Sequence, residues 1–205
     1  IWGLQYDPAM AKVIADADAA CCLMHNRKNT DYQDFMKDVL MDLESSLELA
    51  KNAGISYDKI MIDPGVGFAK SYEQNLTVIK NVSELHSLGL PVLMAASRKS
   101  VVGLTLDLPK DERLEGTIAI TVSAVLSGCS FIRVHDVKEN LRAMRMAKAI
   151  LQAERGFHGL YYDKKPEDIC TSRCVCTGNG KRTELLCECE ALCGYGAGRH
   201  DRCTG

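Results

Sequence analysis

The 205-residue sequence predicts an α/β fold built around a parallel sheet. Four short apolar runs recur along the chain, and each is followed by a segment with the apolar spacing of a helix. Polar residues gather at the point where each apolar run ends. Strands that alternate with helices in this way are typical of a parallel sheet with helices packed outside it.

The predicted strands are too short for helices and do not alternate between polar and apolar residues, as expected for strands buried on both faces. They cover residues 20–25, 59–63, 90–97 and 129–135. The predicted helices cover residues 34–53, 72–88, 114–127 and 137–155. A glycine, a common helix stop, stands directly after each of them. The last helix is expected to begin with a capping box formed by Asp136 and Glu139.

Composition excludes several classes of function. The formal net charge of −2 leaves no basic footprint for nucleic acid or an anionic membrane. No apolar stretch approaches the ~18 residues of a membrane helix, and no signal peptide is visible. Cys21, Cys22 and Cys129 lie in or beside apolar runs, as expected for buried thiols of a reducing compartment. We therefore expect a cytoplasmic protein without a nucleic-acid or membrane partner. Because residue 1 is Ile rather than Met, we expect the gene product to start upstream.

The polar residues at the strand ends predict the position of the functional site. Both solutions for a parallel sheet, the open doubly wound sheet and the eight-stranded barrel, place their sites at the carboxyl ends of the strands. Four strands within 156 residues fit a small open sheet or half of a barrel of ~250 residues. Periodicity alone does not choose between them.

Asp63 ends the second strand, within the stretch IDPGVGFAK. Pro64 stiffens the following turn, while Gly65 and Gly67 permit close approach to the backbone. Two interpretations stay open. The carboxylate binds an N–C–N donor edge, such as a guanidinium or an aminopyrimidine, or it caps its own turn.

Basic residues follow the third and fourth strands. Ser97-Arg98-Lys99-Ser100 suits phosphate or a heterocycle, although a solvated basic turn is the simpler interpretation. Arg133 is predicted to be buried beside apolar neighbours and therefore to need an anion or an aromatic plane. His25 is expected to be a structural hydrogen bonder, and Met24 to line a pocket or the core. No metal-ligand spacing is present in residues 1–156.

Four motifs in order, IDPGVGFAK, AASRKS, RLEGTIA and IRVHDV, resemble the C-terminal half of bacterial dihydropteroate synthase. CLMHNR and the opening IWGLQYDPAM fit the same family, so the resemblance covers residues 1 to about 155. It implies strands 5 to 8 of a (β/α)₈ TIM barrel for residues 1–156. It also implies the condensation of 6-hydroxymethyl-7,8-dihydropterin diphosphate with p-aminobenzoate, which yields 7,8-dihydropteroate and diphosphate, in an enzyme that is a sulfonamide target.

The resemblance also implies roles for single residues. Asp63 and Lys99 bind the pterin, Arg133 stacks on it, and Lys99 and Arg133 are the catalytic residues. Arg133 and His135 reach the diphosphate. Ser97 and Phe68 contact p-aminobenzoate, and Met24 and Phe68 line the pterin pocket.

The resemblance further implies Mg²⁺ and a homodimer for the full-length enzyme. The third-strand aspartate, the fourth-strand asparagine and the early loops that hold Mg²⁺ would precede residue 1, so no metal ligand is expected in this chain. We therefore expect the 205-residue chain to be inactive alone. Ala69 and Ala95 stand where glycine is common in the family, which is expected to narrow the approach to the backbone.

Residues 157–205 differ in composition, with seven cysteines and His200. The segment has too few apolar residues for a core, and no independent fold is expected. Its cysteine spacings indicate zinc only weakly. The codons also permit a reading, one nucleotide later, that resembles dihydroneopterin aldolase, so a frameshift is one hypothesis. Two alternative functions follow: a non-catalytic half-barrel with a zinc-binding tail, or another pterin-binding barrel such as a methyltetrahydrofolate methyltransferase.

Overall fold

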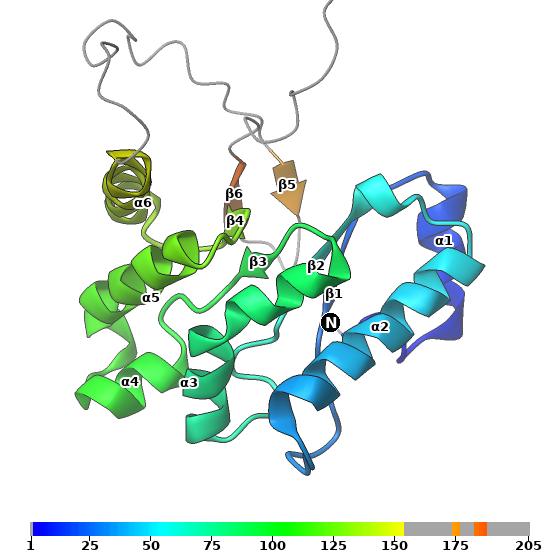
Figure 1. Cartoon of the computed structure of the whole chain (residues 1–205), viewed down its shortest axis with the longest axis horizontal. Coiled ribbons are helices and arrows are strands. Elements are labelled where there is room, and N and C mark those ends of the chain that lie inside the picture. Colours follow the sequence, from blue (N-terminus) through cyan, green and yellow to red (C-terminus); the bar gives the residue numbers. More distant parts are fainter. Residues whose placement is uncertain (1, 154–173, 177–182, 188–205) are drawn as a thin grey trace, which may run out of the picture.

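The computed structural model describes residues 2–153, 174–176 and 183–187 (Figure 1). It confirms the four predicted strands, each shorter than the apolar run that predicted it. They are β1 (Cys21–Met24), β2 (Ile60–Asp63), β3 (Leu93–Met94) and β4 (Phe131–Ile132).

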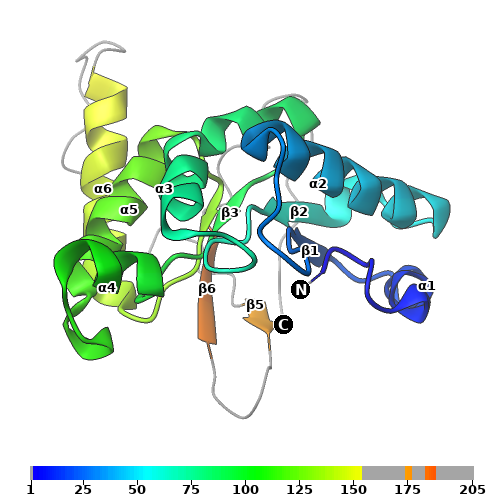
Figure 2. The ribbon, with the colours of Figure 1, turned by 90° about the horizontal axis from the view of Figure 1, so that it is seen from below.

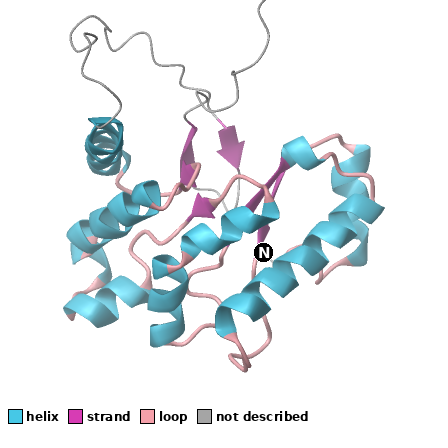
Figure 3. Cartoon of the chain, in the orientation of Figure 1, coloured by secondary structure: helices cyan, strands magenta, loops and turns pink. Residues whose placement is uncertain are grey.

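Helices separate these strands, as Figure 3 shows by the alternation of cyan and magenta. The α-helices are α1 (Pro8–Asp16), α2 (Phe35–Asn52), α3 (Tyr72–Lys80), α4 (Ser100–Leu106), α5 (Leu114–Leu126) and α6 (Val137–Gln152). Short 3₁₀ helices are η1 (Tyr57–Lys59), η2 (Val82–Leu88) and η3 (Lys110–Glu112).

The four strands are parallel and neighbour one another in the order of the sequence. β1 pairs with β2 from Cys21 opposite Ile60 to Met24 opposite Asp63. A bridge between Ile62 and Val92 joins β2 to the start of β3, and β3 pairs with β4. A doubly wound sheet reverses its strand order at a switch point, whereas a (β/α)₈ barrel does not. The order of the described parallel strands therefore contains no switch point.

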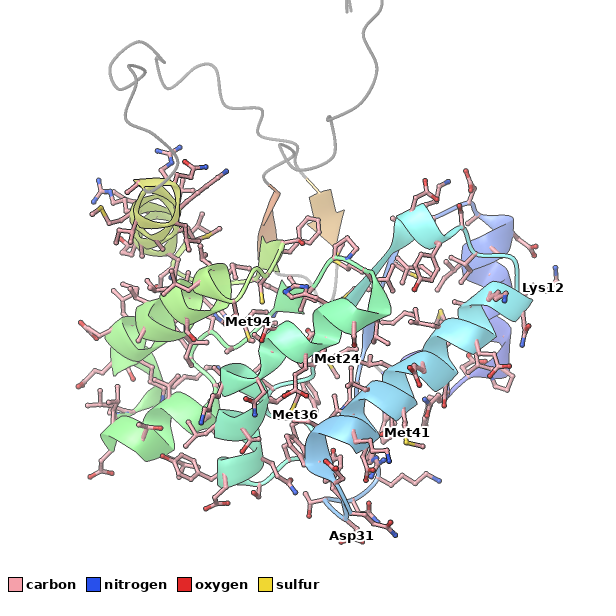
Figure 4. The ribbon with its side chains drawn as sticks, viewed as in Figure 1. Lys12, Met24, Asp31, Met36, Met41 and Met94 are labelled. Carbon is pink, nitrogen blue, oxygen red and sulfur yellow. The ribbon has the colours of Figure 1, made fainter. Side chains whose placement is uncertain are left out.

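The core lies between this sheet and the helices that cover one of its faces (Figures 1 and 2). Its fully buried side chains come from strands and helices alike: Leu23, Ile62, Val92, Val39, Leu43 and Val78. In Figure 4, Met24 and Met94 lie toward the middle of the molecule and Met41 lies on the outer side of α2. The alternating strands and helices thus fix the carboxyl ends of four parallel strands along one edge.

One predicted helix is in fact two. Residues 72–88 form α3 and then the 3₁₀ helix η2, with the break at Asn81. Asn, Val and Ser in succession at 81–83 have low helix propensity, and His86 is drawn toward α5 by a 2.8 Å hydrogen bond to the Ser127 carbonyl. The tertiary contact therefore wins over the apolar spacing.

Two helices were not predicted. α1 begins at Pro8 after Asp7, whose carboxylate accepts a 2.9 Å hydrogen bond from the Ala9 amide. This Asp-Pro start is a helix signal that the sequence does carry. α4 contains Gly103 among β-branched residues and has weak propensity, so only the burial of its Val101 and Val102 accounts for it.

Asp136 is the N-cap residue of α6, as predicted, but the predicted capping box is not formed. The Asp136 side chain makes no cap hydrogen bond to α6. Its carboxylate instead accepts hydrogen bonds from the Arg98 guanidinium, one of them 2.9 Å from Nε. A bidentate charged partner outcompetes a backbone amide for the same oxygens.

Two short strands lie in the cysteine-rich range. β6 (Thr183–Cys187) pairs antiparallel with β4, and β5 (Cys174–Cys176) pairs with β6. Both segments add to the sheet through β4, and the expectation that 157–205 has no independent fold stays a prediction. The rest of that range lies outside the described residues. Among described residues, no helix is long and apolar enough to cross a membrane.

The three cysteines of residues 1–156 are not uniformly buried. Cys21 and Cys129 are partly buried, and burial raises the pKa of the Cys129 thiol to about 12. Cys22, one position after Cys21 on β1, points to the other face of the strand and is exposed. The prediction of a buried thiol is therefore wrong for Cys22.

Candidate active site

The candidate site lies along the carboxyl edge of the parallel strands. Met24 and Asp63 are the last residues of β1 and β2 and stand opposite each other in register. Direct contacts or electrostatic interactions connect the others across neighbouring loops. The residues that the structure gathers here are Met24, Asp63, Phe68, Ser97, Lys99, Arg133 and His135.

Asp63 is buried, with 5% of its surface exposed. Its Oδ1 accepts a 2.7 Å hydrogen bond from the Gly65 amide, so the carboxylate caps its own turn. Its Oδ2 accepts no hydrogen bond from the described residues. The two interpretations of Asp63 are thus compatible: Oδ1 shapes the loop, and no donor among the described residues occupies Oδ2.

Burial and the neighbouring cations shift the pKa of Asp63 in opposite directions. Burial raises the pKa of the Asp63 carboxyl, because desolvation disfavours the anion. The Gly65 amide, Lys99, Lys70 and Arg133 act in the opposite direction. A carboxylate surrounded by cations in a buried site is a strong acceptor for a ligand with N–H donors.

Two glycines make the loop after β2 possible. Gly65 has a φ of +70°, and a Cβ there would lie 2.0 Å from the His25 carbonyl oxygen. Gly67 has a φ of +82°, and a Cβ there would lie 3.2 Å from Cδ of Lys99. The sequence predicted close approach to this backbone, and at Gly65 the approaching backbone is the chain's own, from the end of β1.

Lys99 connects the loop after β3 to the loop after β2. Its ammonium donates a hydrogen bond to the Val66 carbonyl and lies 4.6 Å from the centre of the Phe68 ring. Burial lowers the pKa of Lys99, while Asp63 opposes that shift. The ammonium of Lys99 therefore acts electrostatically on the buried Asp63 carboxylate across the loop.

Ser97 and His135 form a direct pair. The Ser97 hydroxyl oxygen accepts a 3.1 Å hydrogen bond from the His135 amide and lies 2.9 Å from His135 Nδ1. Ser97 is buried, whereas His135 is exposed. Desolvation first, and then Arg98 and Arg133, lower the pKa of His135. The serine thus orients the imidazole at the end of β4.

Arg133 is exposed, so the prediction that it is buried is wrong. Ile132 and Val134 do point into the core, and the alternation of a strand sends Arg133 to the opposite face. Its side chain forms no hydrogen bond or ion pair with any described residue, while its amide donates to the Met94 carbonyl at 3.0 Å. The guanidinium is therefore free to meet an anion or a planar ring.

The expected structural role of His25 is confirmed. The residue is 2% exposed, with Nε2 2.9 Å from Asp42 Oδ2 and Nδ1 2.8 Å from Lys70 Nζ. Burial, followed by the charge of Lys70, lowers the pKa of His25 to about 4. Met24 is buried at 8% exposure, which fits either expected role.

The sequence interpretation gave no role to two residues that shape the loop after β2. Lys70 is half-buried among three acceptors, and burial lowers its pKa to about 7. Asn75 is buried, and its Oδ1 accepts a 2.6 Å hydrogen bond from the Gly67 amide. Lys70 ends the IDPGVGFAK stretch, so its position was visible, but its contact with His25, directly after β1, was not.

The described residues do not fit a resident metal. No group of three or more His, Cys, Asp or Glu side chains among them could hold an ion, so we assign no magnesium ligand here. The cysteine side chains on which the zinc alternative depends lie outside the described part of the chain.

The chain matches known proteins over most of its described part. The profile of the family described as "Pterin binding enzyme" matches residues 1–135. Dihydropteroate synthase of Clostridium beijerinckii is 49% identical over 153 residues, covering 74% of this chain and 57% of that protein. That of Bacillus subtilis is 44% identical over 159 residues, covering 78% of this chain and 56% of that protein.

Solved structures agree. A crystal structure of dihydropteroate synthase from Clostridium difficile in the presence of pteroic acid matches with a TM-score of 0.72 and 47% identity, covering 73% of this chain and 57% of that one. A Yersinia pestis dihydropteroate synthase in a sulfonamide drug complex matches with a TM-score of 0.72 and 36% identity, covering 75% and 58%.

These matches confirm the resemblance to dihydropteroate synthase that the motifs predicted. The chain spans little more than half the length of the curated relatives that it matches. The matched profile covers 135 of its 205 residues and includes the carboxyl ends of all four parallel strands. The chain therefore belongs to the family of pterin-binding enzymes.

Proposed function

We propose that this chain supplies the pterin-binding part of a dihydropteroate synthase, which joins 6-hydroxymethyl-7,8-dihydropterin diphosphate to p-aminobenzoate. The observation that carries the proposal is the buried Asp63 carboxylate, whose Oδ2 accepts no hydrogen bond from the described residues and on which three cationic side chains act. Such a carboxylate matches the N–C–N donor edge of an aminopyrimidine, and the relatives that the chain resembles are dihydropteroate synthases.

The pterin would be held by residues from three loops. Asp63 accepts hydrogen bonds from its aminopyrimidine edge, and Lys99 donates to the ring system. Arg133 stacks on the face of the ring, because its guanidinium is exposed and planar. Met24 and Phe68 supply the apolar wall of the pterin pocket, and Phe68 also extends toward p-aminobenzoate.

The reaction needs a leaving group stabilised and a nucleophile held in line. The C–O bond to diphosphate breaks with its electron pair, and the cationic Arg133 and the imidazole of His135 stabilise the departing anion. The amine of p-aminobenzoate then forms the C–N bond to the pterin methylene and loses a proton. Ser97 lies where p-aminobenzoate binds and also orients His135.

Magnesium, dimerisation and location complete the proposal. The full-length enzyme would use Mg²⁺ held by residues beyond those described here, would act as a homodimer, and would work in the cytoplasm. No step above depends on the metal. The 205 residues alone would bind pterin through Asp63, Lys99 and Arg133.

Calorimetric titration with 6-hydroxymethyl-7,8-dihydropterin diphosphate tests the proposal. Asp63→Asn should raise the dissociation constant about 30- to 150-fold, since it removes about 2–3 kcal/mol of charge-assisted hydrogen bonding. Asp58→Asn is the matched control, because Asp58 is exposed at the amino end of the same strand. Wild-type chain that binds no pterin, or equal affinity in both variants, would contradict the proposal.

DNA sequence upstream of codon 1 gives a second test. Four further strand-helix units, with an aspartate after the third strand and an asparagine after the fourth, would support a full synthase. Conversion of labelled p-aminobenzoate by the 205-residue chain alone would instead contradict the expected lack of turnover.

A further inference from the structure

The ammonium of Lys70 has a complete set of acceptors. Its Nζ lies 2.8 Å from His25 Nδ1 and 3.1 Å from each of the carbonyl oxygens of Gly65 and Phe68. A lysine ammonium has three N–H donors and no acceptor. Three acceptors for three donors is the arrangement of the charged form, and it leaves no N–H of Lys70 for a ligand.

The two carbonyls belong to opposite ends of the loop that carries the candidate site. Gly65 follows Asp63 by two residues, and its amide is the group that holds Asp63 Oδ1. The Phe68 ring faces the Lys99 ammonium. Lys70 therefore joins Gly65, the residue whose amide orients the carboxylate, to Phe68, the residue that carries the aromatic ring.

The third acceptor, His25 Nδ1, connects the Lys70 ammonium to the residue that directly follows β1. For His25 Nδ1 to accept from Lys70, the imidazole must carry its proton on Nε2, and Nε2 lies 2.9 Å from the Asp42 carboxylate. Asp42 in turn accepts a hydrogen bond at 2.5 Å from Arg27 Nε. This chain of contacts determines the tautomer, so the imidazole presents Lys70 with a lone pair and not with an N–H.

Lys70 is not part of an ion pair that would explain its burial. No carboxylate lies within 4.0 Å of its ammonium among the described residues, whereas Lys59, at the amino end of β2, pairs with Asp18. Asp63 is the carboxylate whose charge acts most strongly on Lys70. A half-buried lysine whose hydrogen bonds all go to a loop and a histidine serves to shape that loop.

We propose that Lys70 is a positioning residue, whose ammonium clamps the loop 63–68 against His25 and so sets the geometry of Asp63 and Phe68 for the pterin. This inference rests on the proposed function for its ligand, but the clamp itself does not. Removal of the ammonium should loosen the loop and reduce pterin affinity through Asp63, without contact between Lys70 and the ligand.

Amide hydrogen exchange of the 205-residue chain tests the clamp without a ligand. Lys70→Met should raise exchange of the Gly65 and Phe68 amides about tenfold or more, because both amides bond within this loop. Lys59→Met is the matched control: it removes a lysine from the other end of β2 and should leave these amides unchanged. If Lys70→Met does not fold, Lys70→Gln, which keeps one donor group, is measured in its place.

A double-mutant cycle with Asp63→Asn tests the connection to the ligand. In calorimetric titrations with 6-hydroxymethyl-7,8-dihydropterin diphosphate, Lys70→Met should weaken binding about tenfold in the wild-type background and much less in the Asp63→Asn background. A purely structural lysine would give equal losses in both backgrounds.

The outcomes separate the two proposals. Unchanged exchange at Gly65 and Phe68 overturns the clamp, whatever the affinity. Faster exchange with additive losses of affinity overturns the positioning role but keeps the proposed function. Faster exchange in a chain whose wild type binds no pterin overturns the proposed function and the positioning role together, and leaves the clamp as a feature of the fold.

Discussion

The loops after β2 and after β4 hold their polar side chains in opposite ways. In residues 63–70, Asp63 is buried, and the Lys70 ammonium contacts two backbone carbonyls of the loop and the His25 imidazole. In residues 133–136, the Arg133 and His135 side chains are exposed, and Arg133 has no hydrogen-bonded partner for its guanidinium among described residues.

The difference follows from what each group must do. A carboxylate in a buried site needs fixed donors around it, or burial would leave it protonated. An arginine on a strand end keeps its charge in solvent at little cost and can meet an anion there. The loop after β2 is therefore built for recognition in a set geometry, and the end of β4 for attraction of charge. The predictions below are ordered by their effect on the free energy of unfolding.

The largest effect should come from acid acting on the network of the first loop. The pKa of His25 is lowered from 6.5 to about 4, so the unfolded chain binds this proton first as pH falls. The contribution of neutral His25 to the free energy of unfolding is fully present above pH 6.5. It falls by about 3 kcal/mol as the pH drops from 6.5 to about 4. Urea unfolding across this range measures it. His25→Gln should reduce the dependence of the free energy of unfolding on pH in this range. An equally steep loss of stability in that variant would mean that groups other than His25 cause it.

Asn75→Ala should cost about 2–3 kcal/mol, because the buried Asn75 side chain loses its 2.6 Å hydrogen bond from the Gly67 amide and its two bonds to the Lys70 and Ser71 carbonyls. Asn52→Ala is the control, since Asn52 is exposed at the end of α2 and should change stability by less than about 0.5 kcal/mol. Both values come from urea midpoints at constant slope. Similar costs for the two variants would mean that the first loop does not depend on Asn75.

The two alanines at family glycine positions should respond with opposite signs. Ala69 has a φ of +43°, so Ala69→Gly should stabilise the chain by up to about 1 kcal/mol. Ala95 is 6% exposed and does not have a positive φ, so Ala95→Gly should destabilise it by about 1 kcal/mol through lost burial and greater backbone freedom. Thermal unfolding of both variants checks the signs, and a loss of stability in Ala69→Gly would contradict strain at that residue.

Arg133→Met should have the smallest effect on stability, within about 0.5 kcal/mol, because the side chain is exposed. Its affinity for inorganic diphosphate should nevertheless fall about tenfold, since a charge-assisted contact is worth about 1.5 kcal/mol. Arg142→Met, at an exposed position on α6, is the control for a lost positive charge. A large loss of stability in Arg133→Met would show that the end of β4 is held as firmly as the first loop.

Local pattern accounts for what could be predicted. The apolar runs located all four strands, and the spacing of apolar residues located α2, α5 and α6, because burial against one sheet imposes those periods. The same strand ends predicted which side chains would gather. The pattern overestimated the helix at 72–88 and overlooked the short α1 and α4, whose existence depends on caps and packing.

The sequence by itself determined the order of strands and helices and the polar residues at the carboxyl edge, since both are properties of adjacent residues. Only the tertiary structure decided who partners whom: Lys70 with His25, Asp136 with Arg98 in place of its own helix, and Arg133 with solvent. These partners are 45 and 38 residues apart along the chain, so their contacts are set by strand register and loop closure, which no local pattern encodes.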